Sequence, residues 1–80
     1  MDSQSLSQIQ VGETTNQEML ALFGSPMSQA LDTNGKLVMT WHYVKVQSYV
    51  VTMDVKQQIL SVLFDENGIV EKYSLVDDVN

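Results

Sequence analysis

The stretch of residues 9–26 constrains the fold of this chain most strongly, because it encodes both ends of one short helix. Thr15 and Glu18 have the spacing of a capping box, in which each side chain accepts a hydrogen bond from the backbone N–H of the other residue. Gly24 can adopt the positive φ that ends a helix, and Pro26 prevents the helix from resuming. We therefore expect an amphipathic helix that docks on another part of a fold. Its apolar face consists of Met19, Leu20, Leu22 and Phe23.

The residues before this helix are polar and fit two descriptions. Residues 1–8 are either a flexible lead-in or the start of a first short helix, capped by Asp2 or Ser3. Leu6 and Ile9 would then lie one turn apart on its inner side. The first residues have neither the basic nor the apolar region of a signal peptide.

After the capped helix, the sequence predicts a loop and then a strand. Residues 25–36 are expected to be a loop, because Asp32-Thr33-Asn34-Gly35 combines turn-forming side chains with a Gly that accepts positive φ. Residues 37–46 alternate in the manner of a strand. Both faces of this strand carry apolar groups, so alternation alone does not select the buried face. We expect the face of Leu37, Met39, Trp41 and Tyr43 to be buried, because Trp and Tyr bury the most area.

Two further strands are predicted, after a segment whose conformation stays open. Residues 47–55 either continue the first strand or form a long hairpin loop. Residues 56–65 form the second predicted strand. A hairpin turn follows at Asp65-Glu66-Asn67-Gly68, whose last two residues suit positive φ. Residues 69–76 form the third predicted strand, with Ile69, Tyr73 and Leu75 on one face.

The order of these elements predicts one domain. Segregated helices and strands indicate an α+β fold over residues 1–80, with two short N-terminal helices packed on a three-stranded antiparallel sheet (ααβββ). Residues 1–5 and 77–80 are expected to be flexible ends. The sheet face that the helices do not cover would be exposed to solvent or would bind a partner.

The charge of the chain argues against several classes of ligand. The chain has four Lys, no Arg and ten acidic residues, for a net charge of −6. Nucleic-acid binding depends on Lys and Arg that neutralise phosphates, so we expect none here. A polybasic membrane anchor is disfavoured for the same reason. No apolar run approaches the ~18–20 residues of a membrane-spanning helix.

The residues that catalysis or metal binding would need are mostly missing. The chain has no Cys, and His42 is its one His. A single His cannot build a His-rich metal site, and no Ser lies in a Gly-x-Ser-x-Gly turn. Asp65-Glu66-Asn67-Gly68 lacks the ligand spacing of a calcium loop. We therefore expect no catalytic, cofactor or metal site, and a protein that is not an enzyme.

The candidate protein-binding residues are Tyr49, Val50, Val51 and Met53. In an exposed loop they would form an apolar patch of the kind that marks interaction sites; in a strand they would be ordinary strand residues. Met27 is a further candidate for partner contact, whereas Met19 and Met39 are expected in the core. An unpaired outer strand could also receive a strand from a partner.

Taken in order, these motifs resemble the BamE (SmpA/OmlA) family of small bacterial envelope lipoproteins. The family pattern has an Ile and a Gly before a Thr-capped helix that ends in Gly-x-Pro. A Trp-x-Tyr strand and a closing Leu-x-Val-x-Phe-x-x-x-Gly-x-Val hairpin follow. The matching positions here are Ile9, Gly12, Thr15, Phe23, Gly24, Pro26, Trp41, Tyr43, Leu60, Val62, Phe64, Gly68 and Val70. The spacing between Gly12 and Thr15 and the character of residues 47–56 differ from the best-known member, which favours a relative of that protein.

The resemblance implies two short helices on a three-stranded antiparallel sheet, and a function without catalysis. Family members are lipoproteins that an acylated Cys holds on the periplasmic face of the outer membrane of Gram-negative bacteria. The best-known member is an accessory subunit of the machinery that folds outer-membrane β-barrels, and it binds protein partners and lipid head groups. For this chain the resemblance implies a signal peptide and a lipid-bearing Cys encoded shortly before residue 2. It also implies a protein partner, with the β-barrel assembly machinery as the first candidate.

An alternative interpretation is an inhibitor or immunity-type protein. The β-lactamase inhibitory proteins have a similar helix-on-sheet module, used in tandem. A single acidic module of this size could plug a basic active-site cleft. A soluble secreted form without lipid, bound tightly to an enzyme, would favour this alternative.

Overall fold

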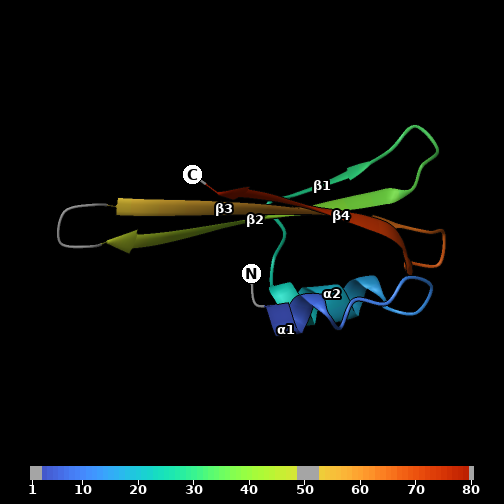
Figure 1. The fold of residues 1–80 in the computed structure, drawn as a ribbon. Coiled ribbons are helices and arrows are strands. Elements are labelled where there is room, and N and C mark those ends of the chain that lie inside the picture. Colours follow the sequence, from blue (N-terminus) through green and yellow to red (C-terminus); the bar gives the residue numbers. More distant parts are fainter. Residues whose placement is uncertain (1–2, 49–52, 80) are drawn as a thin grey trace.

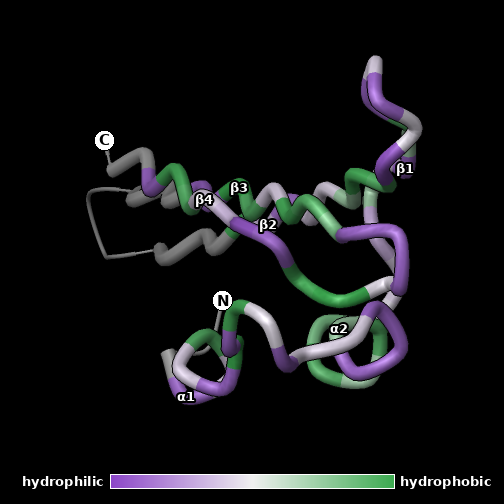
Figure 2. Tube along the Cα trace, turned by 90° about the vertical axis from the view of Figure 1, so that its right-hand side faces the viewer, coloured by the Kyte–Doolittle hydropathy of each residue, from purple (hydrophilic) through white to green (hydrophobic). Residues whose placement is uncertain are grey.

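The computed structural model describes residues 3–48 and 53–79, and it consists of two helices on one side of an antiparallel sheet (Figure 1). The elements are α1 (Ser3–Leu6), α2 (Asn16–Phe23), β1 (Ser28–Leu31), β2 (Leu37–Ser48), β3 (Met53–Phe64) and β4 (Val70–Val79). The strands lie in the order β1-β2-β3-β4. Figure 2 shows the two layers from the side, with the sheet above both helices. The α+β class is therefore as predicted.

The predicted three-stranded sheet is wrong, because part of the predicted loop 25–36 is a strand. β1 pairs with β2 from Ser28–Thr40 to Leu31–Leu37, which makes the sheet four-stranded. All four side chains of β1 are exposed. The strand therefore has no alternation of buried and exposed residues that the sequence could reveal, and backbone pairing with β2 defines it.

The turn between β1 and β2 has the predicted chemistry. Asp32 Oδ1 accepts hydrogen bonds from the backbone N–H groups of Asn34 and Lys36, at 2.8 and 2.9 Å. Gly35 has a φ of 78°. This side-chain anchor turns the chain tightly enough for β1 to fold back on β2.

The turn between β3 and β4 repeats this arrangement. Asp65 Oδ1 accepts from the N–H groups of Asn67 and Ile69, at 2.8 and 3.0 Å. Gly68 has a φ of 78°, and within the described part of the chain only glycines have a positive φ. The predicted positive φ at Asn67 is therefore wrong. The turn that the Asp65 carboxylate holds requires a positive φ only at its last residue, Gly68.

A register shift at the start of β4 decides which of its side chains reaches the core. The shift lies between Leu63 and Phe64, and Phe64 pairs with Val70. As a result Val70 is fully buried, whereas Ile69 is only partly buried. The prediction that Ile69 shares a face with Tyr73 and Leu75 is therefore wrong, because Val70 takes that position. Beyond the shift, Tyr73 and Leu75 lie opposite the buried Val62 and Leu60.

The long hairpin of β2 and β3 shows the conformation of part of residues 47–55, for which the sequence allowed either a strand or a loop. The two strands pair from Val38–Leu63 to Ser48–Met53. Residues 47, 48 and 53–55 therefore continue the strands. β4 extends beyond the predicted strand end at Val76 and reaches Val79.

The capped helix forms as predicted. Thr15 Oγ1 accepts from the Glu18 N–H at 3.1 Å, and Glu18 Oε1 accepts from the Thr15 N–H at 3.2 Å. Gly24 ends α2 with a φ of 79°. Met19 faces the sheet from this helix and is fully buried.

The core lies between the helices and one face of the sheet, and it includes Trp41. The buried apolar residues are Ile9, Met19, Met39, Trp41, Leu60, Val62, Phe64 and Val70. The Trp41 ring lies 5.9 Å from the ring of Phe23, centroid to centroid, and its Nε1–H donates to the Gly24 carbonyl oxygen at 3.0 Å. The predicted buried face of β2 is thus confirmed at Met39 and Trp41. Tyr43, on the same face, is 52% exposed, since the strands extend beyond the helices (Figure 1).

The connection between the two helices pairs with the start of β4. Gly12 N–H donates to the Val70 oxygen and Val70 N–H donates to the Thr14 oxygen, both at 2.8 Å. Asn16 N–H donates to the Gly68 oxygen, also at 2.8 Å. Among the described residues, no backbone hydrogen bond from outside the sheet reaches β4 beyond Val70. Within the described part of the chain, the outer edge of β4 is therefore unpaired from residue 71 onward.

Candidate protein-binding surface

The sheet face that points away from the helices, here called the outer face, carries alternate residues of all four strands. Residues paired across antiparallel strands share a face, so the register assigns the members. They are Ser28, Ala30, Val38, Thr40, His42, Val44, Gln57, Ile59, Ser61, Leu63, Lys72, Ser74 and Val76. Both helices lie on the opposite side of the sheet (Figure 2).

Four hydroxyl side chains form a row across the outer face. Ser28 pairs with Thr40, Thr40 with Ser61, and Ser61 with Ser74. Apolar pairs flank the row on both sides, Val38 with Leu63 and Ile59 with Val76. Val76 is 58% exposed and Ile59 is 37% exposed. The row and these two apolar pairs carry no charged side chain, and the cores of protein interfaces are likewise depleted of charge.

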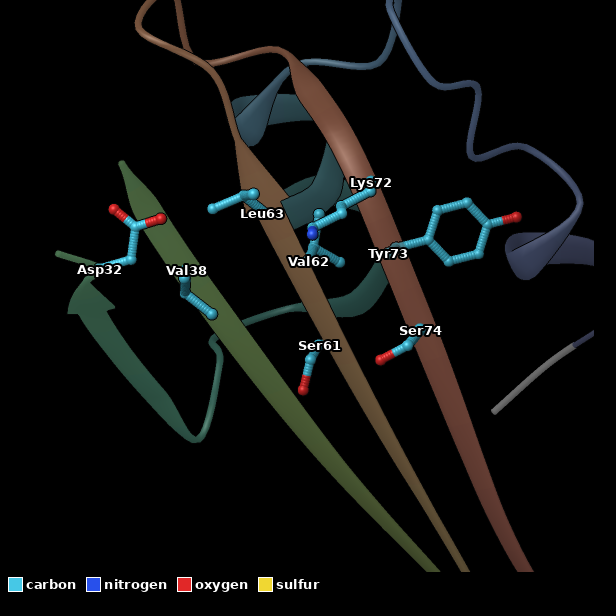
Figure 3. Close-up of a pocket in the computed structure, with 8 residues that line it drawn as sticks. All are labelled: Asp32, Val38, Ser61, Val62, Leu63, Lys72, Tyr73 and Ser74. Carbon is cyan, nitrogen blue, oxygen red and sulfur yellow. The ribbon is translucent and has the colours of Figure 1, made fainter. Parts of the chain in front are cut away.

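A shallow hollow of about 480 Å³ lies on this face (Figure 3). Val38 and Leu63 contribute apolar side chains to its lining, and Ser61 and Ser74 contribute hydroxyls. Asp32 lines it beside β1, and Lys72 lines it from β4. The hollow therefore offers apolar contact between an acidic and a basic side chain, and it contains no His or Cys that could act as a base or a nucleophile.

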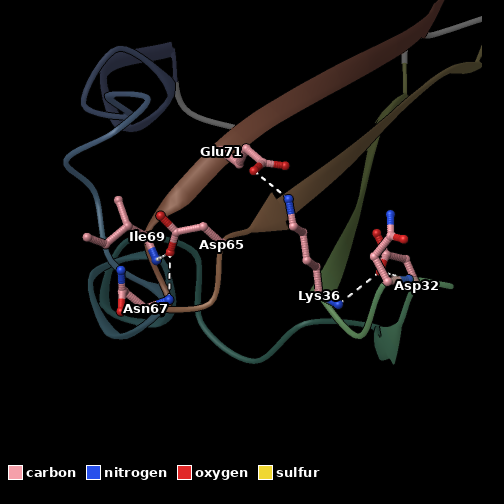
Figure 4. Close-up of polar contacts among 7 residues, drawn as sticks. Asp32, Lys36, Asp65, Asn67, Ile69 and Glu71 are labelled. Atoms are coloured by element: carbon pink, nitrogen blue, oxygen red, sulfur yellow. Dashed lines mark hydrogen bonds and ion pairs between the residues drawn. The ribbon is translucent and has the colours of Figure 1, made fainter.

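Four charged side chains, those of Asp32, Lys36, Asp65 and Glu71, have structural roles (Figure 4). Lys36 Nζ lies 2.7 Å from Glu71 Oε1 and links the start of β2 to β4. The hydrogen bond to Glu71 is the main cause that raises the pKa of Lys36 above its ordinary value. The carboxylates of Asp32 and Asp65 each accept two backbone N–H groups and hold the two turns. These groups stabilise the fold and are not arranged for proton transfer.

The predicted protein-binding residues lie largely outside the described residues. Tyr49, Val50 and Val51 belong to the part of the chain that is not described. Met53 is the first residue of β3, and its side chain also falls outside the described set. The prediction for these four residues stays a prediction. Met27 directly precedes β1 and is 61% exposed, which keeps it available for contact.

His42 lies on the outer face and is exposed. Its Nε2 atom is 3.2 Å from Gln57 Oε1, the neighbouring side chain on β3. Within residues 3–48 and 53–79, no group of three or more His, Cys, Asp or Glu side chains could hold a metal ion. In the same residues, no helix has the length and apolar character needed to cross a bilayer.

Sequence reasoning missed the hydroxyl row. Its four members lie on four different strands, and no local motif connects them. Ser28 falls in the stretch predicted to be a loop, so the sequence does not indicate its pairing with Thr40. The signal that could have found the row is the strand register, which the two Asp-anchored turns help to set.

Comparison with known proteins gives one match. The family model described as the outer membrane protein assembly factor BamE domain matches residues 1–74. The match spans both helices, β1, β2 and β3, and about half of β4. Searches of curated proteins and of solved structures gave no match. Because the family model covers nearly the whole chain, the protein belongs to the BamE family of outer membrane protein assembly factors.

Proposed function

We propose that this chain is a non-enzymatic domain of an envelope lipoprotein that binds a protein partner during outer-membrane protein assembly. The observation that carries the proposal is the BamE family match over residues 1–74. In the natural protein, a lipid on a Cys shortly before residue 2 would hold the domain at the periplasmic face of the outer membrane. The net charge of −6 supports a protein partner over nucleic acid.

Two surfaces are proposed to take part in binding. The first consists of Tyr49, Val50, Val51 and Met53, which lie at or between the ends of β2 and β3. The second is the outer face, whose apolar side chains are partly exposed. The outer face includes residues of β2 and β3, and the first surface joins these two strands in the sequence, so one partner could contact both.

The first experiment is purification of the full-length protein, expressed in its own host, from solubilised envelope. We expect subunits of the β-barrel assembly machinery to co-purify. The double variant Tyr49→Ser/Val51→Ser is expected to lose most of this capture while its Tm changes little. A large fall in Tm would instead show that these two residues are part of the core.

A matched control uses the same residue types elsewhere on the surface. Tyr43 and Val11 are 52% and 57% exposed, and neither belongs to the two proposed surfaces. The control variant Tyr43→Ser/Val11→Ser should keep normal capture. A third variant, Ile59→Lys, places a charge on the outer face and should reduce capture if that face takes part.

Three results would contradict the proposal. Recovery of a different envelope complex, or of no protein, would refute a role in β-barrel assembly. A secreted form without lipid that binds an enzyme tightly would support the inhibitor interpretation. Turnover of a substrate that is lost in His42→Ala would show that the protein is an enzyme.

A further inference from the structure

Among the described residues, no segment pairs with the outer edge of β4 over residues 71–79, and the charged residues of this stretch flank an uncharged centre. The segment of residues 12–16 covers the edge only as far as Val70. Beyond it, β4 contains no Pro, and Tyr73-Ser74-Leu75-Val76 carries no charge. Tyr73, Leu75 and Val76 are 42%, 37% and 58% exposed. An open strand edge of this kind is a template for another strand.

We propose that β4 pairs antiparallel with β4 of a second copy of this chain, so that two four-stranded sheets become one continuous sheet. A twofold axis perpendicular to the sheet generates such a pair, and each residue then contacts the same surface of the other copy. Residues 12–16 block the edge at Val70 in both copies. The longest overlap therefore pairs residues 71–79 with residues 79–71, and it places Leu75 on the axis.

The side chains along β4 are complementary in this register. Leu75 lies opposite Leu75 of the second copy, and Ser74 lies opposite Val76. Because the pairing is symmetric, the pair of Ser74 with Val76 occurs twice. Apolar pairs facing each other across strands are stabilising.

The neighbouring registers are less favourable. A register must shift by two residues to keep each side chain on its face. An axis at Ser74 places Glu71 opposite Asp77, which are like charges. An axis at Val76 shortens the overlap to residues 73–79 and no longer pairs Leu75 with Leu75. The proposed register therefore fits the chain best, and the association needs no other protein.

Sedimentation equilibrium of the purified chain tests the proposal. We expect a reversible monomer–dimer equilibrium in which the mass approaches twice the 9.0 kDa of one chain as the concentration rises. Leu75→Lys places two ammonium groups at the axis and should raise the dissociation constant at least about tenfold. Val44→Lys is the matched control, because Val44 is an exposed apolar residue of β2, far from β4 in the strand order, and is 49% exposed. Its dissociation constant should match the wild type.

A second variant tests the register and does not depend on the fold of Leu75→Lys. Ser74 is exposed and lies opposite Val76 in the proposed register. Ser74→Val therefore places an apolar pair on each side of the axis and should lower the dissociation constant by about threefold or more. A wild-type chain that stays monomeric at the highest soluble concentration would overturn the proposal. So would a dimer that Leu75→Lys does not weaken, or one that Ser74→Val does not strengthen.

Discussion

Trp41 connects the end of α2 to the sheet, and replacing it should remove a large share of the stability of the domain. The indole is 3% exposed, it contacts the ring of Phe23, and its N–H donates to the Gly24 oxygen. Truncating a buried Trp to Ala costs about 3–5 kcal/mol. A chain of 80 residues has a free energy of unfolding of roughly 4–12 kcal/mol. Trp41→Ala is therefore expected to leave the domain marginally stable or unfolded.

Trp41→Phe separates the hydrogen bond from the bulk of the ring. Phe keeps an aromatic ring against Phe23 but has no donor for the Gly24 oxygen, so the lost hydrogen bond should cost about 1 kcal/mol. Phe is also smaller than Trp, so the volume that it leaves unfilled lowers the free energy of unfolding further. The expected order of stability is wild type, then Trp41→Phe, then Trp41→Ala.

Urea unfolding followed by far-UV circular dichroism measures these differences, because the substitutions remove the Trp fluorophore. Tyr43→Ala is the matched control: Tyr43 lies on the same face of β2 but is 52% exposed. Its cost should stay below about 1 kcal/mol. If Trp41→Ala and Tyr43→Ala were equally destabilising, the placement of the core at Trp41 would be wrong.

Three further predictions concern local structure. Gly35→Ala should cost about 1–2 kcal/mol because of its positive φ, and Gly68→Ala should cost more, because its Cβ would lie 3.3 Å from Asn16 Oδ1; equal thermal shifts would contradict this. Thr15→Ala should cost about 1 kcal/mol by removing the helix cap, whereas Thr33→Ala in the exposed β1–β2 turn should change stability little; urea midpoints compare the two. The hydrogen bond to Glu71 raises the pKa of Lys36 above 10.5, so the stability it adds is complete below that pH and is lost as the pH rises through the folded-state pKa. The difference in stability between wild type and Lys36→Met should therefore shrink in alkaline solution, and a difference that grows would refute this sign.

Local chemistry explains why parts of the fold were predictable. The capping box needs only Thr15, Glu18 and the backbone between them, and the structure contains both of its hydrogen bonds. The turns at Asp32 and Asp65 use the same Asp-x-Asn-Gly sequence and form the same two bonds to the Asp carboxylate. In each case the interacting groups lie within four residues, so the sequence alone specifies them.

The missed strand and the altered face of β4 have a different cause. β1 has four exposed side chains, so only its backbone pairing with β2 identifies it as a strand. The register shift before Val70 depends on how β3, β4 and residues 12–16 fit together. An alternation of side chains along β4 cannot reveal such a shift, because one extra residue exchanges the two faces of the strand.

The same distinction between local and long-range interactions applies to the candidate surfaces. The sequence by itself determined the capped helix, the two turns and the motif order that the BamE family shares, because each depends on residue type and short spacing. Only the tertiary structure decided that four hydroxyl groups form one row and that, among the described residues, no segment pairs with the edge of β4 beyond Val70. Both features depend on strand register and on which segments cover which edges, and these follow from contacts between residues far apart in the chain.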